Sequence, residues 1–393
     1  MKLVAVKVMK TQLSFLFNNK LIRLRRMTTN VTKLSDFLMR IKSEGFKNEN
    51  VEGGGNAYNL HERNLLLDSF KIFGALIISL LHLQWKIVPG GYLFVEMFFL
   101  MTGFLLAKNE KKYQAQPILS IFRRRLSSFY FYYFVAFLFA VVLCQFPTGF
   151  DTINYFTFLS SLGLGRFYGF GSLWFLGIYL FFSIGYIYLR KKINYPFFVL
   201  FIIFLVTLFL YTLYSQIPWH GINMTYEKYL GPFPVAFYRG GIGIGLGYIC
   251  FYIADKKKNF FNTNLSVLIG FFVFLLLLYI LFRRTPGSEY DYISYAVFGY
   301  LVPFLFFSKH FLMRKLNLCL SLLPPVIFSL FLEIYIFHYA VIKMASKISS
   351  DSKFFLENHV ALYLILIVIF SLLMKKVRSI VMEKFIRCLP YYN

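Results

Sequence analysis

Residues 195–214 read YPFFVLFIIFLVTLFLYTLY, a run of 20 residues without a charged side chain. A helix rises about 1.5 Å per residue, so a run of this length crosses the roughly 30 Å of hydrocarbon in a bilayer. Similar apolar runs recur at 67–84, 90–107, 126–146, 173–189, 233–253, 265–282, 292–308, 325–342 and 360–374. The sequence therefore predicts an all-α fold, a polytopic integral membrane bundle of about ten transmembrane helices.

The composition of the whole chain agrees with a membrane protein. Of its 393 residues, 58% are apolar and 15% are charged, whereas soluble domains carry about 25% charged residues. These values exclude a soluble multidomain protein, a disordered chain and a small disulfide-rich secreted protein. The four cysteines are far apart and show no metal-ligand spacing, so we expect no metal site.

The formal net charge of +25 is explained by membrane topology and not by binding to nucleic acid. If the N-terminus is cytoplasmic, 32 of the 42 Lys and Arg residues lie in inside segments and 8 in outside segments. This asymmetry follows the positive-inside rule, although Arg283 and Arg284 are local exceptions. We expect a multi-pass protein of the inner or plasma membrane, surrounded by lipid, with both termini in the cytoplasm.

The spans divide the chain into three segments. Residues 1–66 are a basic cytoplasmic segment, expected to be partly disordered, and residues 67–374 form the transmembrane domain. Residues 375–393 form a basic cytoplasmic tail, which is too short for a second catalytic domain. The stretch Leu13–Met27 is compatible with a basic interfacial helix or with sequence upstream of a later start codon.

Ionisable side chains inside a membrane are costly, so each one is a functional candidate. Lys71 lies near the inner end of the first span, and His82 lies 11 residues later, about 16 Å along the helix. His82 can act as a general base or can simply be solvated at the helix end. Glu96 must face the bundle, where we expect it to meet His82 or Arg239. Arg239 can serve as an oxyanion or phosphate ligand, or can only pair with Glu96.

The glycines of residues 240–247 (GGIGIGLG) are spaced as small residues at helix contacts. No strand precedes them, so a dinucleotide-binding loop is rejected. Thr102 and Gly103 in the second span suit the same kind of close helix contact.

Five short motifs follow one another along the chain. Asp68, Lys71 and His82 come first, spaced by three and eleven residues. They are followed by residues 95–105 (VEMFFLMTGFL), the basic Arg123–Arg125, residues 172–176 (SLWFL) and residues 333–338 (EIYIFH). This order resembles that of the membrane-bound acyltransferase family 3, over about residues 63–374.

The resemblance implies an enzyme that transfers an acyl group, with acetyl expected, from cytoplasmic acyl-CoA to a hydroxyl of a cell-surface or lipid-linked glycan. It implies O-acetylation of an envelope polysaccharide, with acyl-CoA as donor substrate and no bound cofactor. His82 would be the general base and Glu96 would orient it. Lys71, Arg123, Arg124 and Arg125 would bind the CoA phosphates, unless the arginines only follow the positive-inside rule.

The remaining candidate residues would line the site. Tyr335 and His338 are three residues apart and share a helix face, although a polar bond between helices is equally compatible with this spacing. The complete set of lining residues is Asp68, Thr102, Trp174, Arg239, Glu333, Tyr335 and His338. The sequence leaves open the acceptor, the oligomeric state and the choice between direct transfer and an acyl-enzyme.

Three positions depart from the family pattern. Lys71 stands where the family usually has Arg, and an ammonium lacks the planar fork of a guanidinium. Thr102 replaces the usual Ser but keeps a hydroxyl, and Phe331 stands where Ser is common, with Ser329 nearby. The departure at Lys71 affects the expected affinity for the donor rather than the expected fold.

Two other classes of protein are compatible with intramembrane charges. A transporter or flippase of a lipid-linked glycan or small solute would use them for binding, and a structural membrane partner would use them only for helix packing. Transporters often contain paired broken helices in repeated halves, and the sequence shows no such pair. The spacing of His82 with residues 95–105 favours the acyltransferase.

Overall fold

The computed structural model describes residues 64–84, 86–143, 149–158, 173–216, 229–283, 289–348 and 356–387. The predicted N-terminal segment, apart from residues 64–66, lies outside them, as do the last six residues of the tail. Within the described ranges the regular secondary structure is helical except for β1 (Tyr229–Leu230) and β2 (Phe233–Pro234), which pair antiparallel. The predicted all-α class is confirmed.

Each of the ten expected spans corresponds to a helix. These are α2 (Leu65–Leu83), α3 (Phe94–Lys108), α5 (Ile118–Leu143), α7 (Trp174–Lys192), α8 (Tyr195–Gln216), α9 (Val235–Lys256), α10 (Asn264–Phe282), α11 (Ile293–Phe307), α13 (Phe331–Ile348) and α15 (Val360–Arg387). Shorter helices are α4 (Glu110–Gln114), α6 (Gly149–Phe156) and α12 (Phe311–Ser321). Single 3-10 turns are η2 (Gly91–Leu93), η5 (Phe260–Asn262), η6 (Glu289–Tyr292) and η7 (Ile327–Ser329).

Fewer helices than expected are long and apolar enough to cross a membrane. Six of the described helices meet that standard: α2, η2 with α3, α5, α8, α10 and most of α15. Helices α11 and α12, bent by 78° at their junction, give a seventh if they form one broken span. Helices α7, α9 and α13 are less apolar, and much of each is buried against neighbouring helices rather than facing outwards. The count of ten therefore stays a prediction.

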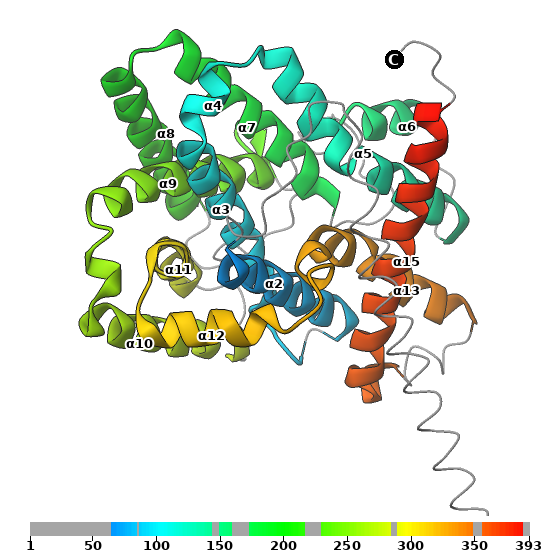
Figure 1. Ribbon diagram of the computed structural model, residues 1–393. Helices are drawn as coiled ribbons and strands as arrows, with labels where there is room; N and C mark the ends of the chain where they lie inside the picture. The colour runs from blue at the N-terminus through cyan, green and yellow to red at the C-terminus, as the bar shows by residue number, and fades with distance from the viewer. Residues whose placement is uncertain are drawn as a thin grey trace, which may run out of the picture. The chain divides into compact units, whose positions relative to one another are not determined.

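Helix α9 packs closely on α3 through glycines, as predicted for residues 240–247. A Cβ on Gly247 would overlap the carbonyl oxygen of Leu100, and one on Gly103 would overlap that of Ile244. Gly245 faces the opposite way and meets Val206 of α8. In Figure 1, α3 lies in the middle of the labelled helices, with α9 and α7 beside it.

The ends of the helices lie on two opposite sides of the bundle. Helices α2 and α13 run parallel, because Lys71 lies over Phe331 near one end and His82 lies beside His338 towards the other. Helices α3, α7 and α9 also run parallel to one another. Near their first residues they hold Glu96, Trp174 and Arg239 together. At the other end Glu110, the first residue of α4, lies with Arg190 of α7 and Tyr252 of α9.

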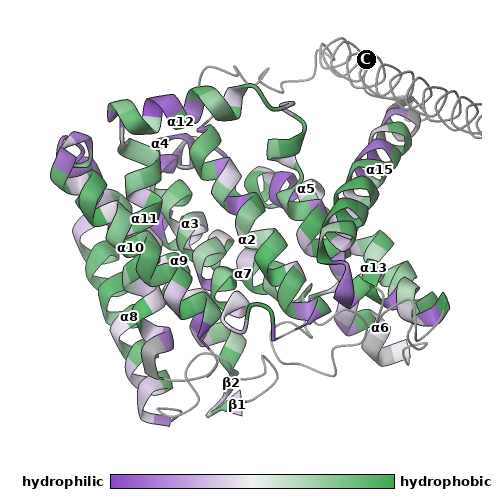
Figure 2. Ribbon diagram, turned by 90° about the horizontal axis from the view of Figure 1, so that it is seen from below, coloured by the Kyte–Doolittle hydropathy of each residue, from purple (hydrophilic) through white to green (hydrophobic). Residues whose placement is uncertain are grey.

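The outer helices are the apolar ones. Figure 2 shows α8 and α10 as hydrophobic along most of their length, whereas α12 alternates hydrophilic and hydrophobic residues. Large apolar side chains such as Phe204 and Phe272 are exposed on α8 and α10. An exposed apolar surface of this kind is suited to lipid.

Candidate functional site

Two histidines from different helices meet inside the bundle. The rings of His82, in the last turn of α2, and His338, in α13, lie 5.0 Å apart and within 20° of parallel. Tyr339 contacts His82 at a centroid distance of 4.9 Å. His338 is fully buried and His82 is half-buried. The structure thus brings together two predicted site residues that are 256 positions apart in the sequence.

Glu96 binds Arg239 and not His82. Its Oε1 accepts a hydrogen bond from Arg239 Nε at 2.6 Å, and its Oε2 accepts one from the Tyr295 hydroxyl at 2.8 Å. The first turn of α3 faces α9 and α11, where a guanidinium neutralises the buried carboxylate. The expected pairing with Arg239 is confirmed, whereas the expectation that Glu96 orients His82 is not met by this geometry.

Arg239 is held from two directions. Besides the carboxylate of Glu96, the ring of Trp174 lies 5.1 Å from its guanidinium carbon, a cation–π contact. Only 4% of Arg239 is exposed. Two predicted site-lining residues therefore meet here, on the same side of the bundle as the end of α2.

Tyr335 lies next to His338 in the interior. Its ring lies 6.1 Å from that of His338 and 5.9 Å from that of Phe98, in the same helix as Glu96. The otherwise apolar interior thus holds polar side chains from α2, α13, α9 and α3.

Lys71 lies on the opposite side and is already paired. Its Nζ is 2.8 Å from Asp68 Oδ1, one turn earlier in α2, and lies over the ring of Phe331. Thr102 donates its hydroxyl proton to the carbonyl of Phe98 in its own helix. Asp68 therefore partly balances the charge of Lys71. The hydroxyl proton of Thr102 is already used in a hydrogen bond within α3.

Arg125 differs from the other two arginines of its motif. Its guanidinium donates to the hydroxyls of Tyr179 at 2.7 Å and Tyr113 at 3.1 Å. No carboxylate forms an ion pair with it within the described ranges. Arg123 and Arg124 are exposed, and the guanidinium of Arg124 donates to the amide oxygen of Gln116 at 2.7 Å. Arg125 is thus a fixed, half-buried cation for which the described residues supply no counter-charge.

Glu333 lies apart from the histidines. It is 3% exposed and accepts a hydrogen bond from the Tyr132 hydroxyl at 2.7 Å. Lys375 and Arg378 of α15 interact with its charge. This cluster joins α5, α13 and α15, so Glu333 stabilises a helix junction near the side of Lys71.

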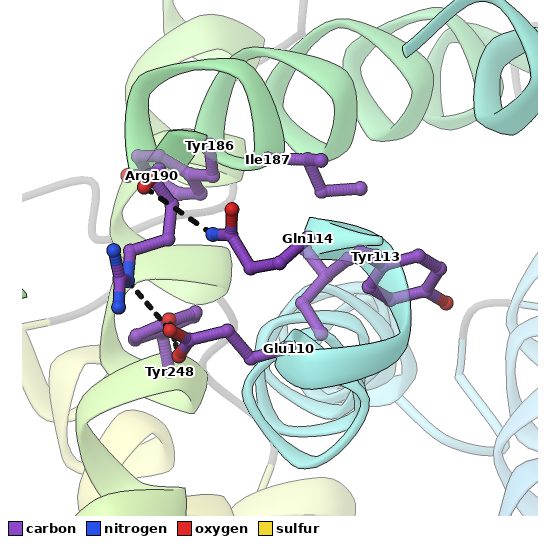
Figure 3. A pocket seen from close by; sticks show the side chains of 8 residues that line it. Glu110, Tyr113, Gln114, Tyr186, Ile187, Arg190 and Tyr248 are labelled. Carbon is purple, nitrogen blue, oxygen red and sulfur yellow. Dashed lines mark hydrogen bonds and ion pairs between the residues drawn. The ribbon is translucent and has the colours of Figure 1, made fainter. Parts of the chain in front are cut away.

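A small pocket opens between α4, α7 and α9, on the same side (Figure 3). Glu110 crosses it to form an ion pair with Arg190, at 2.6 Å between Oε1 and Nε, and also accepts a hydrogen bond from Tyr248. Gln114 donates to the carbonyl of Arg190 at 3.2 Å. Because Tyr113 lines this pocket and also binds Arg125, the pocket adjoins the predicted donor-binding arginines.

Several residues of these clusters could not be predicted from the sequence. Tyr295, Tyr132 and Tyr339 carried no signal, because the chain contains 29 tyrosines. The structure also explains one exception to the charge asymmetry: Arg283 forms an ion pair with the buried Asp291. It is therefore a structural cation and does not contradict the topology.

Comparison with known proteins gives one match. A family model described as an acyltransferase domain matches residues 64–375, a range that contains every candidate site residue. No curated protein and no solved structure matches the chain.

Proposed function

The chain belongs to the membrane-bound acyltransferase family 3, and on this premise we propose that it transfers an acyl group from cytoplasmic acyl-CoA to a hydroxyl of a cell-surface or lipid-linked glycan. The expected acyl group is acetyl. The observation that carries the proposal is the half-buried His82, which lies beside a second imidazole inside the helix bundle.

His82 is proposed as the general base. It removes the proton of the acceptor hydroxyl as the oxygen forms a bond to the thioester carbonyl carbon. When the tetrahedral intermediate collapses, the carbon–sulfur bond breaks and the CoA sulfur takes the proton back from the His82 imidazolium. The product is a glycan ester and free CoA thiol, so no other reactant is consumed.

The donor is proposed to enter from the side that holds Arg125 and Lys71, taken as cytoplasmic from the distribution of basic residues. Arg125 suits a phosphate group best, because no described carboxylate neutralises it and two tyrosine hydroxyls hold it in place. Arg123, Arg124 and Lys71 add positive charge nearby. Lys71 and His82 are separated by about 16 Å along α2, a distance that the long pantetheine arm of CoA can bridge.

The test is transfer of labelled acetyl from acetyl-CoA in membranes that contain wild type, His82→Ala or His310→Gln. His310 is the control because its ring contacts Asn264 and Phe311 rather than any site residue. We expect alkali-labile glycan ester from wild type and His310→Gln, and only a small residual amount from His82→Ala.

The other outcomes are also informative. Equal labelling by wild type and His82→Ala would remove His82 from the mechanism. Absence of labelling with wild type, across acyl-CoAs of several chain lengths, would contradict the proposal and favour a transporter of lipid-linked glycan.

A further inference from the structure

The hydrogen bond of His338 assigns its tautomer. Its Nδ1 lies 2.7 Å from the backbone carbonyl oxygen of Tyr335. A carbonyl oxygen can only accept, so Nδ1 must carry the proton. In the neutral imidazole, Nε2 then carries a lone pair and is a hydrogen-bond acceptor.

This acceptor is unused in the described part of the chain. Nε2 of His338 is buried and makes no hydrogen bond there, although a buried acceptor without a donor is costly. The ring of His82, which has an N–H to offer, lies beside it at a centroid distance of 5.0 Å and nearly parallel. For a hydrogen bond to form, the His82 ring must turn so that one of its N–H groups points at Nε2.

We propose that His338 orients the base, in a relay that runs from the Tyr335 carbonyl through His338 to His82. One N–H of His82 donates to Nε2 of His338, so the other nitrogen of His82 presents its lone pair to the acceptor hydroxyl. After proton transfer the same bond stabilises the imidazolium. His338 is thus a positioning residue in the role first expected of Glu96, which is occupied by Arg239 and Tyr295.

This inference rests on the proposed function. Two substitutions distinguish the role of the Nδ1 atom of His338 from that of its Nε2 atom. His338→Asn keeps an N–H at the place of Nδ1, which bonds the Tyr335 carbonyl, but removes Nε2. His338→Gln offers an amide oxygen near the place of Nε2. In membranes supplied with labelled acetyl-CoA, with the endogenous glycan as acceptor, we expect His338→Asn to lower kcat for ester formation about 10²-fold without changing the KM for the donor. We expect His338→Gln to stay within about tenfold of wild type.

A double mutant tests whether His338 acts through His82. Residues that act as a unit are not additive, so His338→Asn should cause no further loss in His82→Ala. Wild-type kcat in His338→Asn, or a full additional loss in His82→Ala, would overturn the relay. If His338→Asn does not fold in a thermal unfolding assay, His338→Gln decides alone, since the relay requires it to keep activity. Absence of transfer by wild type would instead overturn the proposed function and the relay with it.

Discussion

Arg239 is a buried cation in an apolar interior, where Glu96 and Trp174 offset the cost of removing its charge from water. Removing one partner of a buried ion pair leaves the other charge uncompensated, at a cost of about 3–5 kcal/mol. We therefore expect Arg239→Met to lower the free energy of unfolding by about that amount, measured by denaturation in detergent. The double mutant Glu96→Gln with Arg239→Met should recover most of the loss, because no buried charge remains.

The control for that experiment is an exposed arginine. Arg124→Met removes only a bond to Gln116 and should change stability by less than about 0.5 kcal/mol. If Arg239→Met has the same denaturation midpoint as wild type, the Glu96–Arg239 pair does not stabilise the bundle.

Arg125 is the residue on which donor affinity is expected to depend. A hydrogen bond to a charged group contributes about 1.5–3 kcal/mol, so Arg125→Ala should raise the KM for acyl-CoA roughly 10- to 100-fold with a smaller effect on kcat. Steady-state kinetics at varied donor concentration measure this. Arg314→Ala, an exposed arginine of α12, should leave the KM unchanged. A KM for Arg125→Ala equal to wild type would place the phosphates elsewhere.

At the scale of elements, the contact between α3 and α9 requires residues without a Cβ. Gly247→Ala would push a methyl group into the carbonyl of Leu100, and backbone cannot yield as a side chain can. We expect a loss of about 1–3 kcal/mol or more in unfolding free energy, as for other overpacked interiors.

A second helical glycine provides the matched comparison. A Cβ on Gly185 of α7 meets no other atom within 4 Å. Alanine favours a helix over glycine by about 1 kcal/mol, so Gly185→Ala should be neutral or slightly stabilising. Similar melting temperatures for the two alanine variants in detergent would contradict the close packing of α3 on α9.

The whole molecule has two sides, and the positive-inside rule predicts which one faces the cytoplasm. Asn317 of α12 lies on the side of Lys71, and Tyr214, near the end of α8, lies on the opposite side; both are exposed. After replacement of the native cysteines by serine, an impermeant maleimide should label Tyr214→Cys in intact cells. Asn317→Cys should react only after permeabilisation. The reverse pattern would invert the topology and place Arg125 away from cytoplasmic acyl-CoA.

Local sequence was sufficient for the helical class, for the approximate positions of the helices and for the packing role of the glycines in residues 240–247. Each of these depends on a property of one segment: the length of an apolar run, or the spacing of small residues along one helix. The same holds for the Asp68, Lys71 and His82 motif, because all three lie in one helix and their separation follows from its rise.

The partners of the charged residues were decided only by the tertiary structure. Glu96 was compatible with His82 or with Arg239, and the choice depended on which face of α3 meets α9 and α11. The contact between His82 and His338 likewise joins helices that are adjacent in space and distant in sequence. Which helix faces meet is set by the packing of the whole bundle, and the periodicity of a single helix carries no information about its neighbour.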